Sequence, residues 1–423
     1  MKKLLYGTTA LVAAGLLSSG AYAPDPIKLS VGGYFAGAFH YSDQDDGTLA
    51  GVNEPAANTR SHGIVREAEV IFSGSTTLDN GIKVGVNIQL EAQSSADIID
   101  ESYIWFEGSW GRIQLGAEDD AAYLLNVGAT KATNFFFGVA SPVFSQVECG
   151  TNTLSLFAAP TMASGRPDLG GTAGAGCFIG AYSPLMTSDR EKLTYFTPKF
   201  GGFQFGLSYT PNNHEEPNVV GGDVAGAGTY SALRPDNITG QQGEVISIGA
   251  NWSGKLGEVD IRVSAGYQSA DLEANNTGTA IAALDRAGGT GLNVFEDRDT
   301  WIVAGAFTWK QFTLGASYYH DDYGLRLNGD RVDWTVGLTY KTGPWQFGIE
   351  YANTEAERGG AATTGDDEGE AWALGVSYSL GAGVSLQAEL QFWDIDSGAA
   401  TQALRTAAQN DATVFLIGTT IFF

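Results

Sequence analysis

The sequence predicts an all-β protein, a sixteen-stranded antiparallel β-barrel that spans a membrane and has a long, inward-folded third outer loop. Three observations support the barrel: runs in which apolar and polar residues alternate, connections that alternate between short and long, and an apolar strand at the end of the chain. Alternation with period two puts successive side chains on opposite faces of a strand, so that one face can meet lipid and the other water. Closure leaves no unpaired strand edge in the bilayer.

The first 23 residues have the pattern of a secretory signal peptide that is cleaved. Lys2 and Lys3 precede a short apolar stretch, and Ala21-Tyr22-Ala23 fits the small-residue cleavage site before Pro24. The apolar stretch is too short for a membrane helix, and no later window holds 18 or more uncharged apolar residues. We therefore expect a mature protein of residues 24–423 that forms one barrel domain.

The chain is strongly acidic, with 48 acids against 23 bases and a net charge of −25. Loss of Lys2 and Lys3 with the signal peptide makes the charge of the mature protein −27. This balance argues against a nucleic-acid partner, whose phosphates select Lys and Arg. Cys149 and Cys177 are the only cysteines. Export favours a disulfide between them, and a pair of free thiols is the alternative.

Sixteen runs after Pro24 are interpreted as strands, and most have the ten or so residues that a tilted membrane strand needs. The runs are 27–41, 64–77, 82–93, 98–108, 111–117, 190–199, 203–210, 244–254, 257–269, 298–309, 311–322, 331–341, 344–354, 368–380, 384–395 and 412–423. Connections after even-numbered runs are tight, as at Gly201-Gly202 and Lys255-Leu256, and those after odd-numbered runs are mostly long. Such sorting is typical of an outer-membrane barrel with short periplasmic turns.

The alternation within runs indicates which side meets lipid. In 82–92, Ile, Val and Leu alternate with polar residues that include Lys83, Gln89 and Glu91. Burying these three in a dry core would be costly, so we expect a wet interior. Aromatic residues gather near the strand ends, which predicts two interfacial girdles. Examples are Trp252 and Trp345 near the short turns, and Trp105 and Trp372 near the long loops.

The last run, 412–423, is apolar on both faces and ends at Phe423. In a soluble protein such a free strand would pair with other chains and aggregate. We therefore expect it to close the barrel against another strand of the same sheet.

Together these features resemble the Gram-negative general porins. The resemblance is carried by the terminal Phe423, the meander of sixteen runs, and the segments 102–116 and 195–203. It implies a homotrimer in the lipid of the cell outer membrane, in which each monomer is a pore for passive diffusion of ions and small hydrophilic solutes. It also implies that Phe423 is the recognition signal for assembly.

The interval 118–189 is the longest, and the resemblance implies that this third outer loop folds inward and narrows the pore. Its acids are Glu118, Asp119, Asp120, Glu148 and Asp168. We expect them to face bases at the inward-facing positions of the wall, namely Lys28, Lys83, Arg112, Arg190, Lys192 and Arg262. Run two carries Glu67 and Glu69 where relatives often place arginine. With the net charge, this departure predicts a mild preference for cations.

Signals for enzymatic chemistry are weak. Gly249 to Lys255 comes close to a phosphate-binding loop, but Leu256 replaces the required Ser or Thr. The four histidines lack metal-ligand spacing, and no G-x-S-x-G motif occurs. We expect no enzyme activity, no cofactor and no resident metal. Acid clusters at 43–46 and 365–368 could hold calcium loosely, although solvated loop charge explains them better.

Three rival functions stay open at this point. A solute-specific outer-membrane channel usually has a file of aromatics along its pore, whereas Tyr34, Tyr319 and Trp393 on the inward parity are scattered. A barrel lipase would need a nucleophile constellation, which we do not find. A secreted soluble β-adhesin would extract without detergent.

Overall fold

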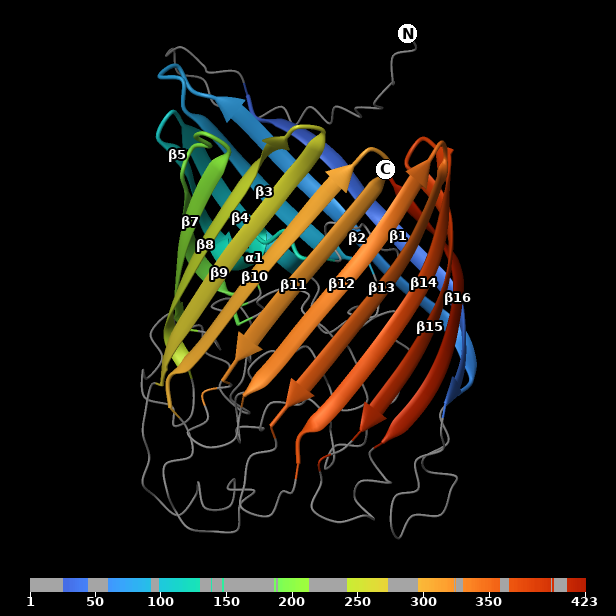
Figure 1. The fold of residues 1–423 in the computed structure, drawn as a ribbon. Coiled ribbons are helices and arrows are strands. Elements are labelled where there is room, and N and C mark those ends of the chain that lie inside the picture. The colour runs from blue at the N-terminus through green and yellow to red at the C-terminus, as the bar shows by residue number, and fades with distance from the viewer. Residues whose placement is uncertain are drawn as a thin grey trace, which may run out of the picture.

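The computed structural model describes residues 26–44, 60–92, 99–129, 138, 147, 186–187, 189–212, 242–272, 296–322, 324, 330–357, 365–396, 398 and 409–423. Within these residues, sixteen strands form one closed antiparallel barrel in which β1 pairs with β16 (Figure 1). The predicted fold class is confirmed. The described part of the chain holds no helix that is long and apolar enough to cross a membrane. The expected signal peptide lies outside the described residues.

The strands follow one another around the wall in chain order. The first eight are β1 (Lys28–Gln44), β2 (His62–Thr77), β3 (Lys83–Glu91), β4 (Ile99–Gly108), β5 (Gly111–Ala117), β6 (Glu191–Phe196), β7 (Phe203–Asn212) and β8 (Gln242–Leu256). The second eight are β9 (Val259–Leu272), β10 (Arg298–Trp309), β11 (Phe312–Asp321), β12 (Arg331–Thr342), β13 (Trp345–Ala356), β14 (Asp367–Gly381), β15 (Val384–Asp396) and β16 (Asn410–Phe422). One short helix, α1 (Ala121–Leu124), follows β5 and lies within the ring of strands (Figure 1).

Alternate side chains along each strand meet different surroundings, as the period of two requires. On β13, Trp345 and Phe347 are each 44% exposed on the outside of the barrel, whereas the inward Glu350 is fully buried. On β16, the outward Phe415 and Ile417 alternate with the buried Val414 and Leu416. The outward faces of these strands therefore carry apolar side chains suited to lipid.

Outward aromatic rings contact one another near both ends of the barrel. Near the short turns, Trp345 and Tyr378 have ring centroids 4.6 Å apart. Near the long connections, Tyr351 and Trp372 are also 4.6 Å apart. The assignment of Trp105 to the outer girdle is wrong. Its strand register pairs it with Gly85 on the inner face, because a glycine there leaves room for the indole ring.

The short connections join even-numbered strands to the next strand, as predicted. The turn between β8 and β9 lies at Gly257-Glu258, two residues later than the expected Lys255-Leu256. The reason is conformational: Gly257 has φ = +61°, a left-handed value that glycine adopts without strain. The seam between β1 and β16 is extended by reciprocal backbone hydrogen bonds of 3.0 and 3.1 Å between Gly33 and Phe423. The terminal strand therefore closes the barrel.

Candidate functional site

The segment that follows β5 enters the barrel and lies against the inner wall of β6 to β9, where α1 makes its contacts. Two glycines on this wall make the approach possible. A Cβ atom at Gly249 would lie 2.2 Å from the carbonyl oxygen of Ala121, and one at Gly266 would lie 2.9 Å from the Cβ of Ala122. Any side chain at Gly249 is therefore excluded while α1 is in place.

Serine side chains on successive wall strands receive the backbone of this segment. The N–H of Ala121 donates to Ser208 Oγ on β7 at 2.8 Å, and the N–H of Ala122 donates to Ser247 Oγ on β8 at 3.1 Å. Further along, the N–H of Val127 donates to Ser264 Oγ on β9 at 3.0 Å. These bonds satisfy buried backbone donors and fix where the loop lies on the wall.

Asp120 is the N-cap residue of α1 and is 1% exposed. Its Oδ1 accepts hydrogen bonds from the N–H groups of Ala122 and Tyr123 and from Ser247 Oγ at 2.7 Å. Its Oδ2 accepts from Thr187 Oγ1, also at 2.7 Å, and from Gln268 Nε2. The expected constriction acid Asp120 is thus enclosed by its own loop and the wall, and it positions the loop.

Two further described residues of this segment, Gly138 and Val147, lie against another part of the wall. The N–H of Gly138 donates to the Glu389 carboxylate of β15, at 3.1 Å from Oε1. Val147 packs in a buried cluster with inward residues of β13 to β16, among them Trp393 and Val414. Because β15 is seven strands from β8 in a ring of sixteen, these contacts span the barrel. The described residues of the 118–189 segment therefore contact walls on opposite sides of the interior.

A β-bulge gives the wall an extra inward acid. Ile88 pairs with Ser102 and Leu90 pairs with Ile99, so β4 has one more residue than β3 over this stretch. The bulge lets the consecutive residues Asp100 and Glu101 both reach the inner face. Gln89 Nε2 donates to Glu101, and Asp100 joins a second group of acids. Re-aiming a side chain in this way is a known use of bulges.

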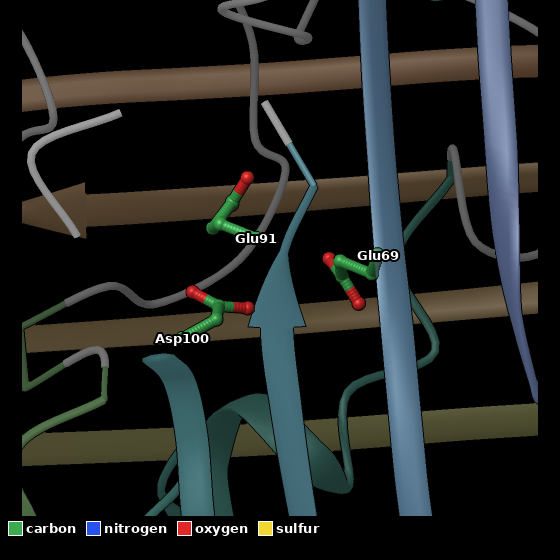
Figure 2. Close-up of side chains that lie close together, drawn as sticks. All are labelled: Glu69, Glu91 and Asp100. Atoms are coloured by element: carbon green, nitrogen blue, oxygen red, sulfur yellow. The ribbon is translucent and has the colours of Figure 1, made fainter. Parts of the chain in front are cut away.

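Two groups of three carboxylates result from this arrangement. Figure 2 shows Glu69 of β2, Glu91 of β3 and Asp100 of β4, with carboxylate oxygens within 4.8 Å of one another. The second group, with the same spacing, is Glu101, Asp119 and Asp189. It joins the wall to both ends of the inward loop. Either set of oxygen ligands is of the kind that hard cations prefer.

Burial changes the titration of the loop acids next to this wall. Desolvation raises the pKa of the Glu118 carboxyl, although a hydrogen bond from Tyr103 opposes the rise. Desolvation, followed by repulsion from Asp189, raises the pKa of Asp119 well above its usual value. Lys192 lies among these acids, and its Nζ donates to the backbone carbonyl of Glu118. One ammonium group therefore serves several carboxylates.

The bases of β1, β3 and β5 lie closer to the short turns than the two groups of three carboxylates do. Lys28 and Arg112 line a hollow of about 260 Å³ together with Trp105 and Tyr103. The guanidinium carbon of Arg112 lies 4.6 Å from the centre of the Trp105 ring, within cation–π distance. Lys83 forms an exposed ion pair with Glu107 at 3.8 Å. Both groups of three carboxylates lie farther from the short turns, whereas Glu107 lies beside Lys83.

The remaining expected site residues fall into three groups. Register places Lys192 and Arg262 on the inner face, opposite Gly116 and Ser253 respectively, and Arg190 directly precedes β6. Glu148, Asp168, Cys149 and Cys177 lie outside the described residues. Phe423 is 63% exposed at the end of the closing strand.

Sequence reasoning missed Glu91, Asp100, Glu101 and Asp189 as members of the acidic wall. A signal was present in the adjacent pair Asp100-Glu101, because strict alternation would send one of these two charges toward lipid. The aromatic pair Tyr103 and Trp105 was also missed as part of the inner face.

Comparison with known proteins places these features in context. A family model described as Gram-negative porin matches residues 7–398. An uncharacterised protein of Rickettsia felis is 24% identical and aligns over the whole of both chains. A Rickettsia conorii protein, also uncharacterised, is 23% identical with the same coverage.

Solved structures show the same fold. The anion-selective porin from Comamonas acidovorans superimposes with a TM-score of 0.54 at 16% identity, covering 94% of this chain and 100% of that one. The trimer form of OmpT, an outer membrane protein of Vibrio cholerae, gives 0.53 at 15% identity, with 93% and 99% covered. At these identities the likeness concerns the fold alone.

Proposed function

This chain belongs to the Gram-negative porin family, and from that premise we propose that it forms a water-filled channel for passive diffusion of ions and small hydrophilic solutes, with a mild preference for cations. As a porin it is a multi-pass β-barrel of the outer membrane and not an enzyme. The cation preference and the range of solutes are our proposal.

The acidic inner wall is the observation that carries the cation preference. Glu67 and Glu69 of β2 both hydrogen-bond to Tyr34, at 2.9 and 2.8 Å from its hydroxyl oxygen. They stand on the same side of the interior as the carboxylates of Asp100 and Glu101. Charges of one sign in a narrow passage with low-dielectric walls raise the local concentration of the opposite ion. This wall therefore favours cations.

In the described residues, loop acids lie beside wall acids, with the wall base Lys192 among them. Glu118 and Asp119 meet Glu101, whereas Arg112 and Lys28 lie nearer the short turns. An ion entering from the long-loop side passes the carboxylates before it reaches these bases. This order supports selectivity by an acidic filter.

Single-channel recording in a planar bilayer with a KCl gradient tests the proposal. We expect a zero-current potential of the sign given by greater K⁺ permeation, and a smaller potential when Glu67→Gln and Glu69→Gln are combined. Glu258→Gln is the matched control, since it removes a carboxylate from the short turn between β8 and β9. A wild-type potential of the opposite sign contradicts the proposed preference.

A solute-specific channel is the alternative, favoured by the hollow that holds Trp105, Tyr103 and Arg112. Aromatic faces and a guanidinium group can bind one solute through stacking and charge. Saturable block of the current by a single sugar or amino acid supports this alternative. Proportional, unsaturated passage of many solutes supports the general channel.

We also propose that the protein assembles as a homotrimer. The trimer form recorded for Vibrio cholerae OmpT supports this by analogy. We place the contact between subunits on the outward side of β1 and β2, where Gly33, Gly37 and Gly74 carry no side chains of their own. Chemical crosslinking in mild detergent is expected to give trimers, and recovery of monomers alone counts against the proposal.

A further inference from the structure

Three carboxylates meet at the point where the inward loop leaves the wall and returns to it. Glu101 belongs to β4, Asp119 follows the end of β5, and Asp189 precedes β6. Their oxygens lie within 4.8 Å of one another. Carboxylates held this close in a partly buried place repel one another unless they take up protons or a cation.

Glu118 provides a second, independent indication of a ligand here. Its side chain is only 6% exposed, and its Oε2 has no hydrogen-bond partner among the residues that the structure describes. A buried carboxylate oxygen without a donor is costly. The Glu118 side chain is hydrogen-bonded to Tyr103 and to Glu101, and it interacts electrostatically with Asp189, so it borders the same group.

A basic side chain already lies among these acids. Lys192 interacts with Glu118, Asp119 and Asp189 and carries a single charge. Arg112 stacks on Trp105. A divalent cation would add positive charge beside these carboxylates and could bind several of their oxygens at once.

We propose that this group binds a calcium ion, with Glu101, Asp119 and Asp189 as ligands and Glu118 completing the oxygen shell. Calcium accepts six to eight oxygens at roughly 2.4 Å in flexible geometry. Oxygens on opposite sides of such an ion are about 4.8 Å apart, which the observed spacing allows. Magnesium fits less well, because it requires a tighter octahedron and keeps more of its water.

The bound ion would tie both ends of the inward loop to β4, so the position of the loop would depend on calcium. This consequence rests on the proposed channel function, whereas the binding itself does not. The acids at 43–46 and 365–368, where the sequence suggests loose calcium binding, are not members of this group.

Terbium luminescence tests the site directly. The full-length protein is folded in detergent, stripped with EDTA and titrated with Tb³⁺, which replaces Ca²⁺ and emits when a nearby tyrosine is excited. Tyr103 is hydrogen-bonded to Glu118 and therefore adjacent to the ion. Competition by Ca²⁺ then gives its affinity. Because transport is not measured, failure of this test leaves the channel proposal standing.

We expect Ca²⁺ to bind at least tenfold more weakly to Asp189→Asn and to Glu101→Gln than to wild type. Glu107→Gln is the control, since Glu107 is also an inward acid of β4 but pairs with Lys83. Either variant of the site suffices if the other fails to fold. Unchanged Ca²⁺ affinity in both Asp189→Asn and Glu101→Gln overturns the proposal. A loss of affinity in Asp100→Asn alone also overturns it, because the ion would then bind to the other group of three carboxylates, Glu69, Glu91 and Asp100.

Discussion

Replacing Gly249 with alanine tests how the inward loop is held against the wall. The new Cβ would lie 2.2 Å from the carbonyl oxygen of Ala121, whereas ordinary contact begins near 3.4 Å. Helix α1 must therefore move by about 1 Å. That movement lengthens the hydrogen bonds to Ser208 and Ser247, now 2.8 and 3.1 Å, beyond useful range.

Two buried hydrogen bonds of about 1 kcal/mol each amount to about 2 kcal/mol of lost docking energy. This corresponds to roughly a 30-fold larger population of the displaced loop. In single-channel recordings we expect frequent transitions to a second conductance level and more open-channel noise. Gly305→Ala on β10 is the control, because a Cβ there meets its nearest atom at 3.5 Å. If Gly249→Ala gave the same current traces as wild type, the inward loop would not be held to the wall by these two hydrogen bonds.

Three further changes probe other parts of the structure. Asp120→Ala removes the cap of α1 and leaves buried donors unpaired; we expect a loss of about 2 to 4 kcal/mol in loop docking, seen as faster proteolysis of the loop. Asp321→Asn leaves the buried Arg298 without its carboxylate, 2.8 Å away, and should lower the free energy of unfolding in urea by about 3 to 5 kcal/mol. Asp260 forms an exposed ion pair with Lys255, so Asp260→Asn should lower the free energy of unfolding by less than about 1 kcal/mol in the same assay. Equal losses in the two variants would contradict the greater importance of the buried pair. Deletion of Phe423 should sharply reduce the folded protein recovered from outer membranes, and normal recovery would dismiss its role as an assembly signal.

The barrel could be predicted from the sequence because its physical requirements are local. A strand that separates lipid from water shows its period directly, and tight turns with glycines mark the periplasmic side. Closure by residues 412–423 followed from a strand with two apolar faces. The turn at Gly257 was misplaced by two residues, since polar and apolar residues near strand ends fit either position.

The site was less predictable because it depends on register. The contacts of Ser208 and Ser247 with α1 exist only once β7 and β8 are aligned, and the sequence does not give that alignment. One extra residue in β4 brings both Asp100 and Glu101 to the inner face, which simple alternation hides. Trp105 was misassigned because both faces of its strand carry aromatic rings.

Alternate residues of each strand meet water inside the barrel and lipid outside it. Single cysteines can be placed at the inward positions Gln204 and Gln346 and at the outward positions Phe205 and Phe347, in a background without Cys149 and Cys177. A water-soluble, membrane-impermeant maleimide is then applied to protein in lipid vesicles. We expect rapid labelling at the two glutamine positions and little at the two phenylalanine positions. Equal labelling of the two pairs would contradict the assignment of these positions to a wet interior and a lipid-facing exterior.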